Sequence, residues 1–339
     1  MRVAMYYNNK DVRLEEMPKP KIGSAEILVK VKACGICGSD VMEWYRLKKA
    51  PLVLGHEATG EIVEVGKEVK NYKVGDRVFV MHHVPCNTCR YCLSGNHTVC
   101  QTLHTTNYYP GGFSEYIRVP AINVERGVFL LPDEISFAEA TFIEPIACVI
   151  RAQRMVNFKP AQTMLILGSG LSGLLHLLVA RQAGAKRVIT TDINEYRLKT
   201  AKEFQATAVI SAKEDLASRL LQLNENRLAD LVVVCTSALS AFEQALQCVD
   251  CAGTILCFAP TEPGVNLCVP VNDFWRNSIK IMHSYGGAPL DIAQAIELLR
   301  AKVIDVKKLI THCLSLLEAA KGFGLVAEAN ECIKVILKP

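Results

Sequence analysis

Four cysteines stand within one short stretch of the chain, CNTCRYCLSGNHTVC, at Cys86, Cys89, Cys92 and Cys100. Four thiolates at this C-x2-C-x2-C-x7-C spacing can surround one tetrahedral ion and leave no open position, as in a structural zinc site. An iron–sulfur cluster also takes four cysteines, but the ferredoxin run continues as x3-C-P and this one does not. A zinc ribbon splits its ligands into two distant pairs. The spacing therefore favours a structural metal site.

A second group of metal donors lies upstream, in the stretches ACGICGSD and LGHEATGE. Cys37, His56 and Glu57 offer a soft, a borderline and a hard ligand. With one further carboxylate they could hold a zinc ion that keeps one coordination position for substrate. A His-Glu pair is more often ordinary surface chemistry, so these residues alone leave both interpretations open.

A glycine-rich loop ends the apolar run TMLIL and opens a predicted helix. Its G-x-G-x-x-G spacing is followed, nineteen residues after Gly173, by Asp192 at the end of the next predicted strand. This context is typical of a dinucleotide-binding loop, whose backbone amides hold the pyrophosphate. Asp192 can bind both ribose hydroxyls and would repel a 2′-phosphate, which predicts NAD rather than NADP. The predicted cofactor contacts are Gly168, Gly170, Ser172, Gly173, Asp192 and Arg197.

The pattern of apolar residues changes near residue 149. Before it, alternating stretches such as EILVKVKAC and TGEIVEVG predict many short strands. From 149 to 285, apolar strands such as KRVITTDI alternate with helical stretches such as LSGLLHLLVARQAGA. This alternation indicates an α/β fold with a doubly wound parallel sheet. A last helix, IAQAIELLRAK, and a last strand, CIKVILKP, follow.

The composition of the chain limits the function classes. Its 339 residues exceed one ordinary core and predict two domains. The net charge of +4 is small and mixed, so we do not expect nucleic acid as a partner. Neither a leader nor an uncharged apolar stretch of about 20 residues is present, so we expect no membrane span. Fourteen cysteines are too few for a disulfide scaffold in a chain of this size, so we expect a soluble cytoplasmic protein.

Seven stretches together resemble the zinc-dependent medium-chain dehydrogenases, and within them the polyol branch with sorbitol and threonine dehydrogenases. In chain order these are CGICGSD, GHEATGEIVEVG, VGDRVFV, the four-cysteine stretch, GGFSEY, EPIAC and GSGLSG. The resemblance covers nearly the whole chain. It implies a β-rich GroES-like catalytic domain over 1–148, an NAD-binding Rossmann domain over 149–285, and a segment, 286–339, that returns to the catalytic domain. It also implies a homodimer or a homotetramer.

The same resemblance implies two zinc ions per subunit. Cys37, His56 and Glu144 of EPIAC would match the catalytic zinc ligands, and Glu57 would stand beside the metal or bind through water. The structural zinc ligands would be Cys86, Cys89, Cys92 and Cys100.

The implied reaction is the reversible oxidation of a secondary alcohol by hydride transfer to NAD. Ser39 would match the hydroxyl that first receives the substrate proton. Many members carry a histidine three residues further on, where this chain has Met42. The proton would therefore leave through water or through Glu43.

The expected substrate is a small polyol, a cyclitol or a related hydroxy compound. Sorbitol dehydrogenases carry an Arg-Tyr pair where this chain has Ser284 and Tyr285. Tyr285 is predicted to line the substrate pocket, and the missing arginine argues against sorbitol itself. Hydroxy amino acids and sugar-alcohol phosphates are the alternatives. Two other classes, a metal-free quinone reductase and a non-catalytic dinucleotide-binding protein, would lack zinc ligands that this chain has.

Overall fold

The computed structural model describes residues 1–339, which divide into two units. One unit comprises Met1–Ala147 and Gly287–Pro339, and the other comprises Cys148–Gly286. The C-terminal residues share a core with the N-terminal ones because the last strand, β16 (Lys334–Lys338), pairs antiparallel with β3 (Ile27–Gly35).

The first unit is rich in short strands and short helices. Its other strands are β1 (Arg2–Asn8), β2 (Asp11–Glu16), β4 (Leu52–Val53), β5 (Glu57–Val65), β6 (Arg77–Val80), β7 (Tyr116–Val119), β8 (Val128–Leu130) and β15 (Ile310–Ser315). Its α-helices are α1 (Glu43–Arg46), α2 (Arg90–Leu93), α3 (Gln101–Thr105), α4 (Ala121–Gly127), α5 (Phe137–Ala140), α12 (Pro289–Arg300) and α13 (Ala319–Glu328). Its 3-10 helices are η1 (Gly38–Val41), η2 (Leu47–Lys49), η3 (His97–Val99), η4 (Lys307–Leu309) and η5 (Leu316–Glu318).

Strand β3 lies at the centre of the larger sheet of this unit. Seven strands form that sheet in the order β15-β16-β3-β5-β6-β8, with β7 also paired to β3, and β2-β1-β4 form a smaller sheet. Along β3, Val29, Val31 and Ala33 are buried and Lys30 is exposed, which is the period of two that its sequence predicts. The β-rich first domain is therefore confirmed.

The second unit contains six strands, each followed by a crossover or a loop. They are β9 (Thr163–Leu167), β10 (Arg187–Asp192), β11 (Ala208–Ser211), β12 (Ala229–Val234), β13 (Val249–Cys257) and β14 (Lys280–His283). The helices are α7 (Leu171–Gln182), α8 (Glu195–Glu203), α9 (Leu216–Leu223), α10 (Leu239–Cys248) and α11 (Val271–Arg276). Helix α6 (Ile143–Met155) crosses from one unit into the other.

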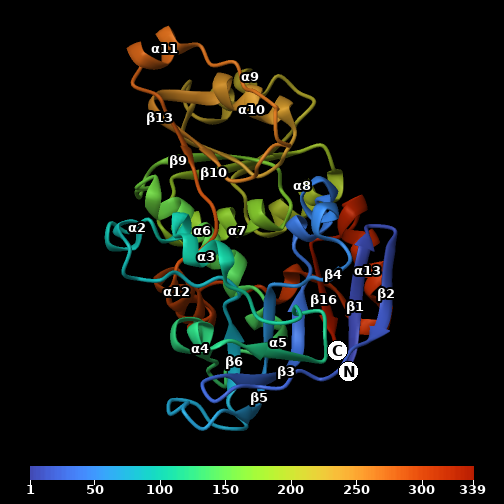
Figure 1. The fold of residues 1–339 in the computed structure, drawn as a ribbon. Coiled ribbons are helices and arrows are strands. Elements are labelled where there is room, and N and C mark those ends of the chain that lie inside the picture. The colour runs from blue at the N-terminus through green and yellow to red at the C-terminus, as the bar shows by residue number, and fades with distance from the viewer. The chain divides into compact units, whose positions relative to one another are not determined.

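All neighbouring strands of this second sheet are parallel, in the order β11-β10-β9-β12-β13-β14. Counted from β9, this is the 3-2-1-4-5-6 order of the Rossmann fold. Figure 1 shows α7 and α10 on opposite faces of the sheet. Every residue of β9 is buried, as a strand covered on both faces requires. The doubly wound parallel sheet is therefore confirmed.

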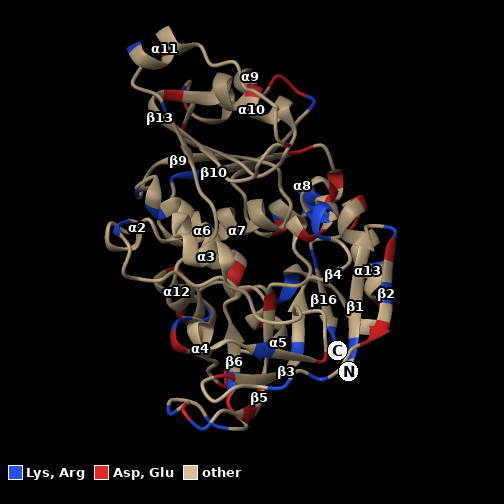
Figure 2. Cartoon of the chain, in the orientation of Figure 1, with Lys and Arg blue, Asp and Glu red and all other residues tan.

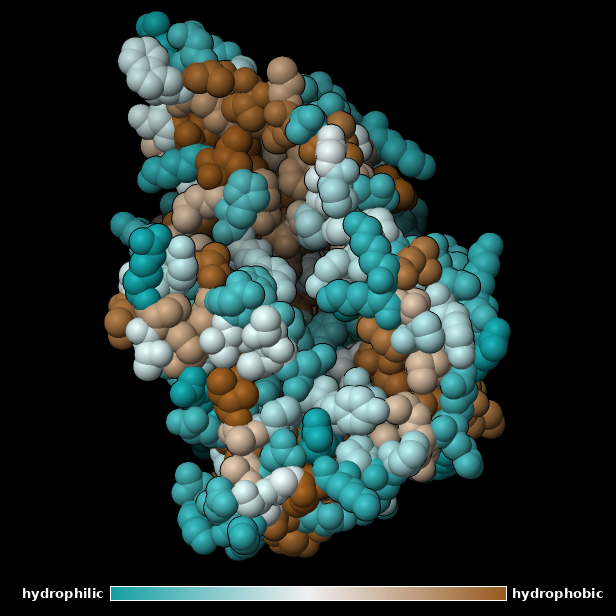
Figure 3. Space-filling model, in the orientation of Figure 1, coloured by the Kyte–Doolittle hydropathy of each residue, from teal (hydrophilic) through white to brown (hydrophobic).

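The surface carries mixed charge and scattered apolar side chains. In Figure 2, basic and acidic residues are scattered over both units. In Figure 3, apolar side chains gather around β13 and α10 of the second unit. Among the most exposed large apolar side chains of that unit are Val271 and Trp275 of α11, with 73% and 78% of their surface exposed. No helix has the length and apolar character that a membrane span needs.

Candidate active site and metal centres

Three predicted metal donors converge in the first unit. Ligand atoms of Cys37, His56 and Glu57 all lie within 4.8 Å of one another. Cys37 follows β3 and caps η1, and Glu57 opens β5 directly after His56. The antiparallel register places Gly35 at the end of β3 opposite Glu57. Two neighbouring strand ends therefore bring together donors that the sequence separates.

A buried carboxylate orients this group. Asp40 is fully buried; its Oδ1 lies 3.4 Å from His56 Nδ1, and its Oδ2 accepts a 3.0 Å hydrogen bond from the Cys37 amide. Burial raises the pKa of Asp40, but His56 and Arg46 lower it more, so the net shift is downward and the group stays ionised. An imidazole whose Nδ1 faces a carboxylate presents Nε2 to a metal. Asp40 stands in the stretch CGICGSD, yet we assigned it no role from the sequence.

Arg46 contacts the predicted proton acceptor Ser39. Its Nε donates to the Ser39 carbonyl at 2.9 Å and its Nη2 to Ser39 Oγ at 3.2 Å. Glu43 faces elsewhere, because its Oε1 accepts from the Asn9 amide at 3.0 Å. An arginine cannot accept a proton. The structure therefore places a fixed cation, and not Glu43, beside Ser39, and the exit route of the proton stays a prediction.

A lysine from the last strand pairs with the acidic donor. The ammonium of Lys334 on β16 contacts Glu57 Oε2, and both side chains are fully buried. A Cβ at Gly35 would overlap the ends of both side chains, so a larger residue there would displace this buried pair. The second carboxylate oxygen, Glu57 Oε1, is buried and has no hydrogen-bond partner. Buried polar atoms normally have one. A cation bound with Cys37 and His56 would satisfy this oxygen, so the donor set fits a zinc ion.

Glu144 lies outside the group of converging donors. It occupies the first turn of α6 and is partly buried. Burial raises the pKa of Tyr108 well above its usual range. Negative charge on four nearby groups raises it further: Cys34, Asp40, Glu57 and Glu144. Glu144 and Glu57 are therefore both close enough to Tyr108 to affect its pKa. Its role as the third protein ligand stays a prediction.

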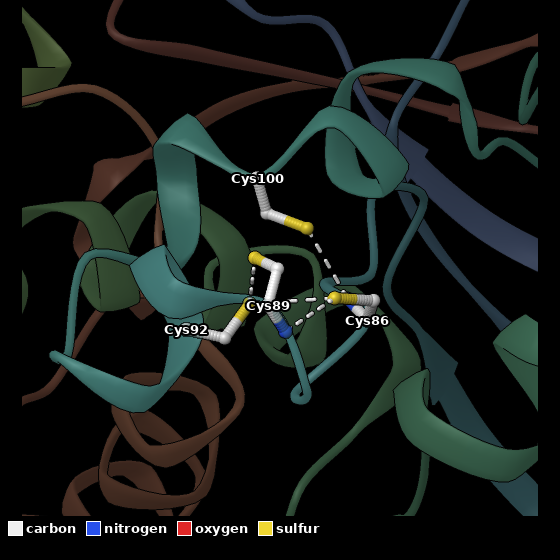
Figure 4. Close-up of side chains that lie close together, drawn as sticks. All are labelled: Cys86, Cys89, Cys92 and Cys100. Carbon is white, nitrogen blue, oxygen red and sulfur yellow. Dashed lines mark hydrogen bonds between the residues drawn. The ribbon is translucent and has the colours of Figure 1, made fainter.

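The four cysteines of the second set also converge. Figure 4 shows the sulfur atoms of Cys86, Cys89, Cys92 and Cys100 facing one centre. Cys89 Sγ lies 3.5 Å and Cys86 Sγ 3.9 Å from Cys92 Sγ. Tetrahedral zinc with bonds of about 2.3 Å separates its sulfur ligands by about 3.8 Å. All four are free thiols, so this segment, residues 86–100, fits a closed zinc site. We call it the cysteine lobe.

Backbone amides also favour the thiolate form of Cys86, whereas burial raises the pKa of Cys92 to about 12. The amides of Thr88 and Cys89 donate to Cys86 Sγ at 3.4 and 3.2 Å. These hydrogen bonds lower the pKa of Cys86 to about 5, and those from Thr88 have a larger effect than the one from Cys89. Thiolates are the form that binds metal. The turn that leads into α2 therefore prepares Cys86 for binding a cation.

The glycine loop and Asp192 adjoin each other in the second unit. Gly168 has φ +99°, and a Cβ at Gly173 would overlap the Gly168 carbonyl. The carboxylate oxygens of Asp192 accept from the amides of Ser169, at 2.8 Å, and Asn194, at 2.9 Å. Loop and carboxylate are therefore held in one place. This arrangement fits a dinucleotide, with phosphates at the loop and a ribose at Asp192.

Two further predicted contacts border this loop. Arg197 Nη1 lies 3.9 Å from Asp192 Oδ2, and its guanidinium would be the nearest group to a Cβ at Gly170. Ser172 lies in the first turn of α7, directly after the loop. Both residues therefore border the glycine loop, and their contact with a dinucleotide stays a prediction.

Tyr285 follows β14 and is half exposed, at 51%. Its neighbour Ser284 accepts a 3.2 Å hydrogen bond from Arg151 Nη1 of helix α6. A guanidinium thus lies beside the position where sorbitol dehydrogenases carry an arginine, although it comes from another element. The sequence contained no signal for this contact, because 133 residues separate the two.

Comparisons with known proteins identify the family of the chain. The family model of the alcohol dehydrogenase GroES-like domain matches residues 23–133, and that of the zinc-binding dehydrogenases matches residues 173–301. The chain is 33% identical to sorbitol dehydrogenase of Bacillus subtilis (strain 168), over 100% of this chain and 97% of that protein. This chain belongs to the zinc-dependent medium-chain alcohol dehydrogenases. It is also 34% identical to L-threonine 3-dehydrogenase of Bacillus velezensis, over 96% of this chain and 95% of that protein.

Solved structures place this alcohol dehydrogenase among similar folds. Galactitol-1-phosphate dehydrogenase of Escherichia coli superposes with a TM-score of 0.88 at 26% identity, over 100% of both chains. A zinc-binding dehydrogenase of Sinorhizobium meliloti 1021, bound to NADP, superposes with a TM-score of 0.87 at 25% identity, over 100% of this chain and 99% of the other. Family membership makes the protein an oxidoreductase with a GroES-like domain and a Rossmann domain.

Proposed function

We propose that this enzyme oxidises a secondary alcohol of a polyol, a cyclitol or a related hydroxy compound to a ketone, with NAD as hydride acceptor. The observation that carries the proposal is the convergence of Cys37, His56 and Glu57, with one Glu57 oxygen buried and unpaired. The similarity to a sorbitol dehydrogenase supports the polyol class. Similarity to a threonine dehydrogenase and to a sugar-alcohol phosphate dehydrogenase supports the two alternatives.

The protein's own residues bind and orient the reactants. When bound, zinc supplies a Lewis acid for the alcohol oxygen, and NAD supplies the hydride acceptor. Cys37, His56 and a carboxylate, Glu57 or Glu144, would hold the metal. Asp40 holds the imidazole of His56 in one orientation, 3.4 Å away. Ser39 would receive the proton of the substrate hydroxyl and pass its own proton on to water, and the adjacent Arg46 guanidinium, which donates to Ser39 Oγ, would hold this hydroxyl in place.

A substrate panel tests this function. The purified enzyme is supplied with NAD and with alditols, cyclitols, 2,3-butanediol, threonine, galactitol 1-phosphate, ethanol and 1-butanol, and NADH formation is followed. We expect the highest kcat/KM for a compound with neighbouring hydroxyls, because zinc polarises one hydroxyl and leaves the other for protein contacts. If ethanol or 1-butanol gave the highest kcat/KM and every polyol failed, the proposal would be refuted.

The choice of NAD depends on Asp192. We expect wild-type enzyme to prefer NAD. The Asp192 carboxylate repels the 2′-phosphate of NADP, and in the NADP complex it lacks the ribose 2′-hydroxyl as a hydrogen-bond partner. Asp192→Ala should reduce the ratio of kcat/KM with NAD to kcat/KM with NADP by about fivefold to 150-fold, which corresponds to a loss of about 1–3 kcal/mol of discrimination. Asp133→Ala, a fully exposed carboxylate of the other unit, is the control and should leave the ratio unchanged. A wild-type enzyme that is faster with NADP would contradict the assignment.

The cysteine lobe is proposed as a structural zinc site. Cys89→Ala should remove one zinc per subunit and lower the melting temperature, because a closed thiolate site contributes directly to folding. Elemental analysis and thermal unfolding measure both effects. Cys251→Ala, at an exposed cysteine outside both donor groups, is the matched control and should change neither. Unchanged zinc content and melting temperature in Cys89→Ala would exclude the assignment.

Zinc content also separates the other function classes. Two ions per subunit fit the proposed enzyme, one fits a non-catalytic dinucleotide-binding protein that keeps the cysteine lobe, and none fits a quinone reductase. We further propose a cytoplasmic location, where thiols stay reduced. We also propose a homodimer or a homotetramer; the exposed Val271 and Trp275 are apolar surface that an assembly would cover.

A further inference from the structure

A histidine that the mechanism does not use lies beside the catalytic group. The ring of His82 lies 5.0 Å from that of His56, centroid to centroid, and the ring of His83 lies 3.9 Å from His82. His82 follows β6, the neighbour of β5, which begins immediately after His56. No nitrogen of His82 belongs to the group of converging metal donors. His82 therefore borders the metal centre without being one of its ligands.

The imidazole of His82 has an unused polar atom. Its Nδ1 is buried and has no hydrogen-bond partner. The backbone at this point is fixed, because the side-chain Nδ2 of the fully buried Asn123 donates to the carbonyls of Met81, at 3.0 Å, and His82, at 2.9 Å. Packing against the His56 and His83 rings needs only a flat ring, which phenylalanine would also supply. The nitrogen is therefore the feature that packing does not explain.

We infer that His82 binds a second hydroxyl of the substrate whose first hydroxyl is oxidised at the metal centre. This inference rests on the proposed function and narrows it to compounds with neighbouring hydroxyls. A substrate held at Cys37, His56 and Glu57 must occupy space beside the His56 ring, which His82 borders. A neutral imidazole nitrogen can donate to a hydroxyl or accept from it. A site built to bind a hydroxyl discriminates against analogues that lack it, because its polar atom is then left unpaired.

The test compares 2,3-butanediol with 2-butanol, which share a carbon skeleton and a secondary alcohol and differ in the second hydroxyl. Wild-type enzyme should prefer the diol. His82→Phe keeps the ring and removes the nitrogen, so kcat/KM for the diol should fall by about tenfold while that for 2-butanol changes by less than about twofold. The loss should appear mainly in KM. His82→Asn restores a polar group near the Nδ1 position and should recover part of the diol activity.

Binding without turnover gives a second readout. Calorimetric titration of the two alcohols into the enzyme–NADH complex should show a weaker diol affinity in His82→Phe and an unchanged 2-butanol affinity. Equal losses on both alcohols would mean that His82 is only structural, and no loss on the diol would mean that it does not face substrate. Either result overturns the inference while leaving the proposed dehydrogenase function intact. A wild-type enzyme that oxidises 2-butanol and not the diol overturns the inference as well.

Discussion

Replacing His56 by alanine is expected to abolish alcohol oxidation. The imidazole is one of three converging donors, and Asp40 holds it in place, so its loss removes the metal from the catalytic group. A metal acting as a Lewis acid contributes several kcal/mol to the transition state, so kcat should fall by at least about a thousandfold. Zinc content should drop from two to one per subunit, and this loss is measurable independently of activity.

Two controls separate this effect from general damage. NADH binding to His56→Ala, followed by fluorescence, should stay close to wild type because the glycine loop belongs to the other unit. His312→Ala changes a partly exposed histidine on β15 that lies outside both donor groups, and it should leave zinc content and kcat unchanged. A His56→Ala enzyme with wild-type turnover would refute the proposed mechanism.

Replacing Lys334 by methionine is expected to produce the largest loss of stability. The variant leaves the Glu57 carboxylate fully buried without its counter-charge. Removing one partner of a buried ion pair costs about 3–5 kcal/mol of unfolding free energy. The loss should be greatest in metal-free protein, because a bound cation also compensates Glu57. Urea denaturation with and without a chelator measures both values.

Matched variants test whether charge is responsible. Lys334→Arg keeps the cation and should lose less stability than Lys334→Met. The double variant Glu57→Gln with Lys334→Met removes both charges and should be more stable than Lys334→Met alone. If Lys334→Met unfolded at the same urea concentration as wild type in metal-free buffer, the buried ion pair would not be a determinant of this site.

Several features were predictable because they depend on neighbours in the chain. The cysteine lobe lies within one short stretch, and the glycine loop connects one strand to the next helix, so local spacing determines both. The parallel sheet of the second unit followed from strands that alternate with helices, since parallel strands need crossover connections. Asp192 was predictable because it ends the strand next to the loop.

Other features were decided only by tertiary structure, because they depend on the register of strands that are distant in sequence. Lys334 meets Glu57 across 277 residues because β16 and β5 both pair with β3, and the missing side chain of Gly35 leaves room between them. The ring of His82 reaches that of His56 because β6 pairs with β5. Spacing along a chain contains no information about such pairings, which depend on how whole strands align and which side chains they bury. The sequence by itself therefore determined which donors and loops the protein has, and the fold decided which charges and hydrogen-bonding groups surround them.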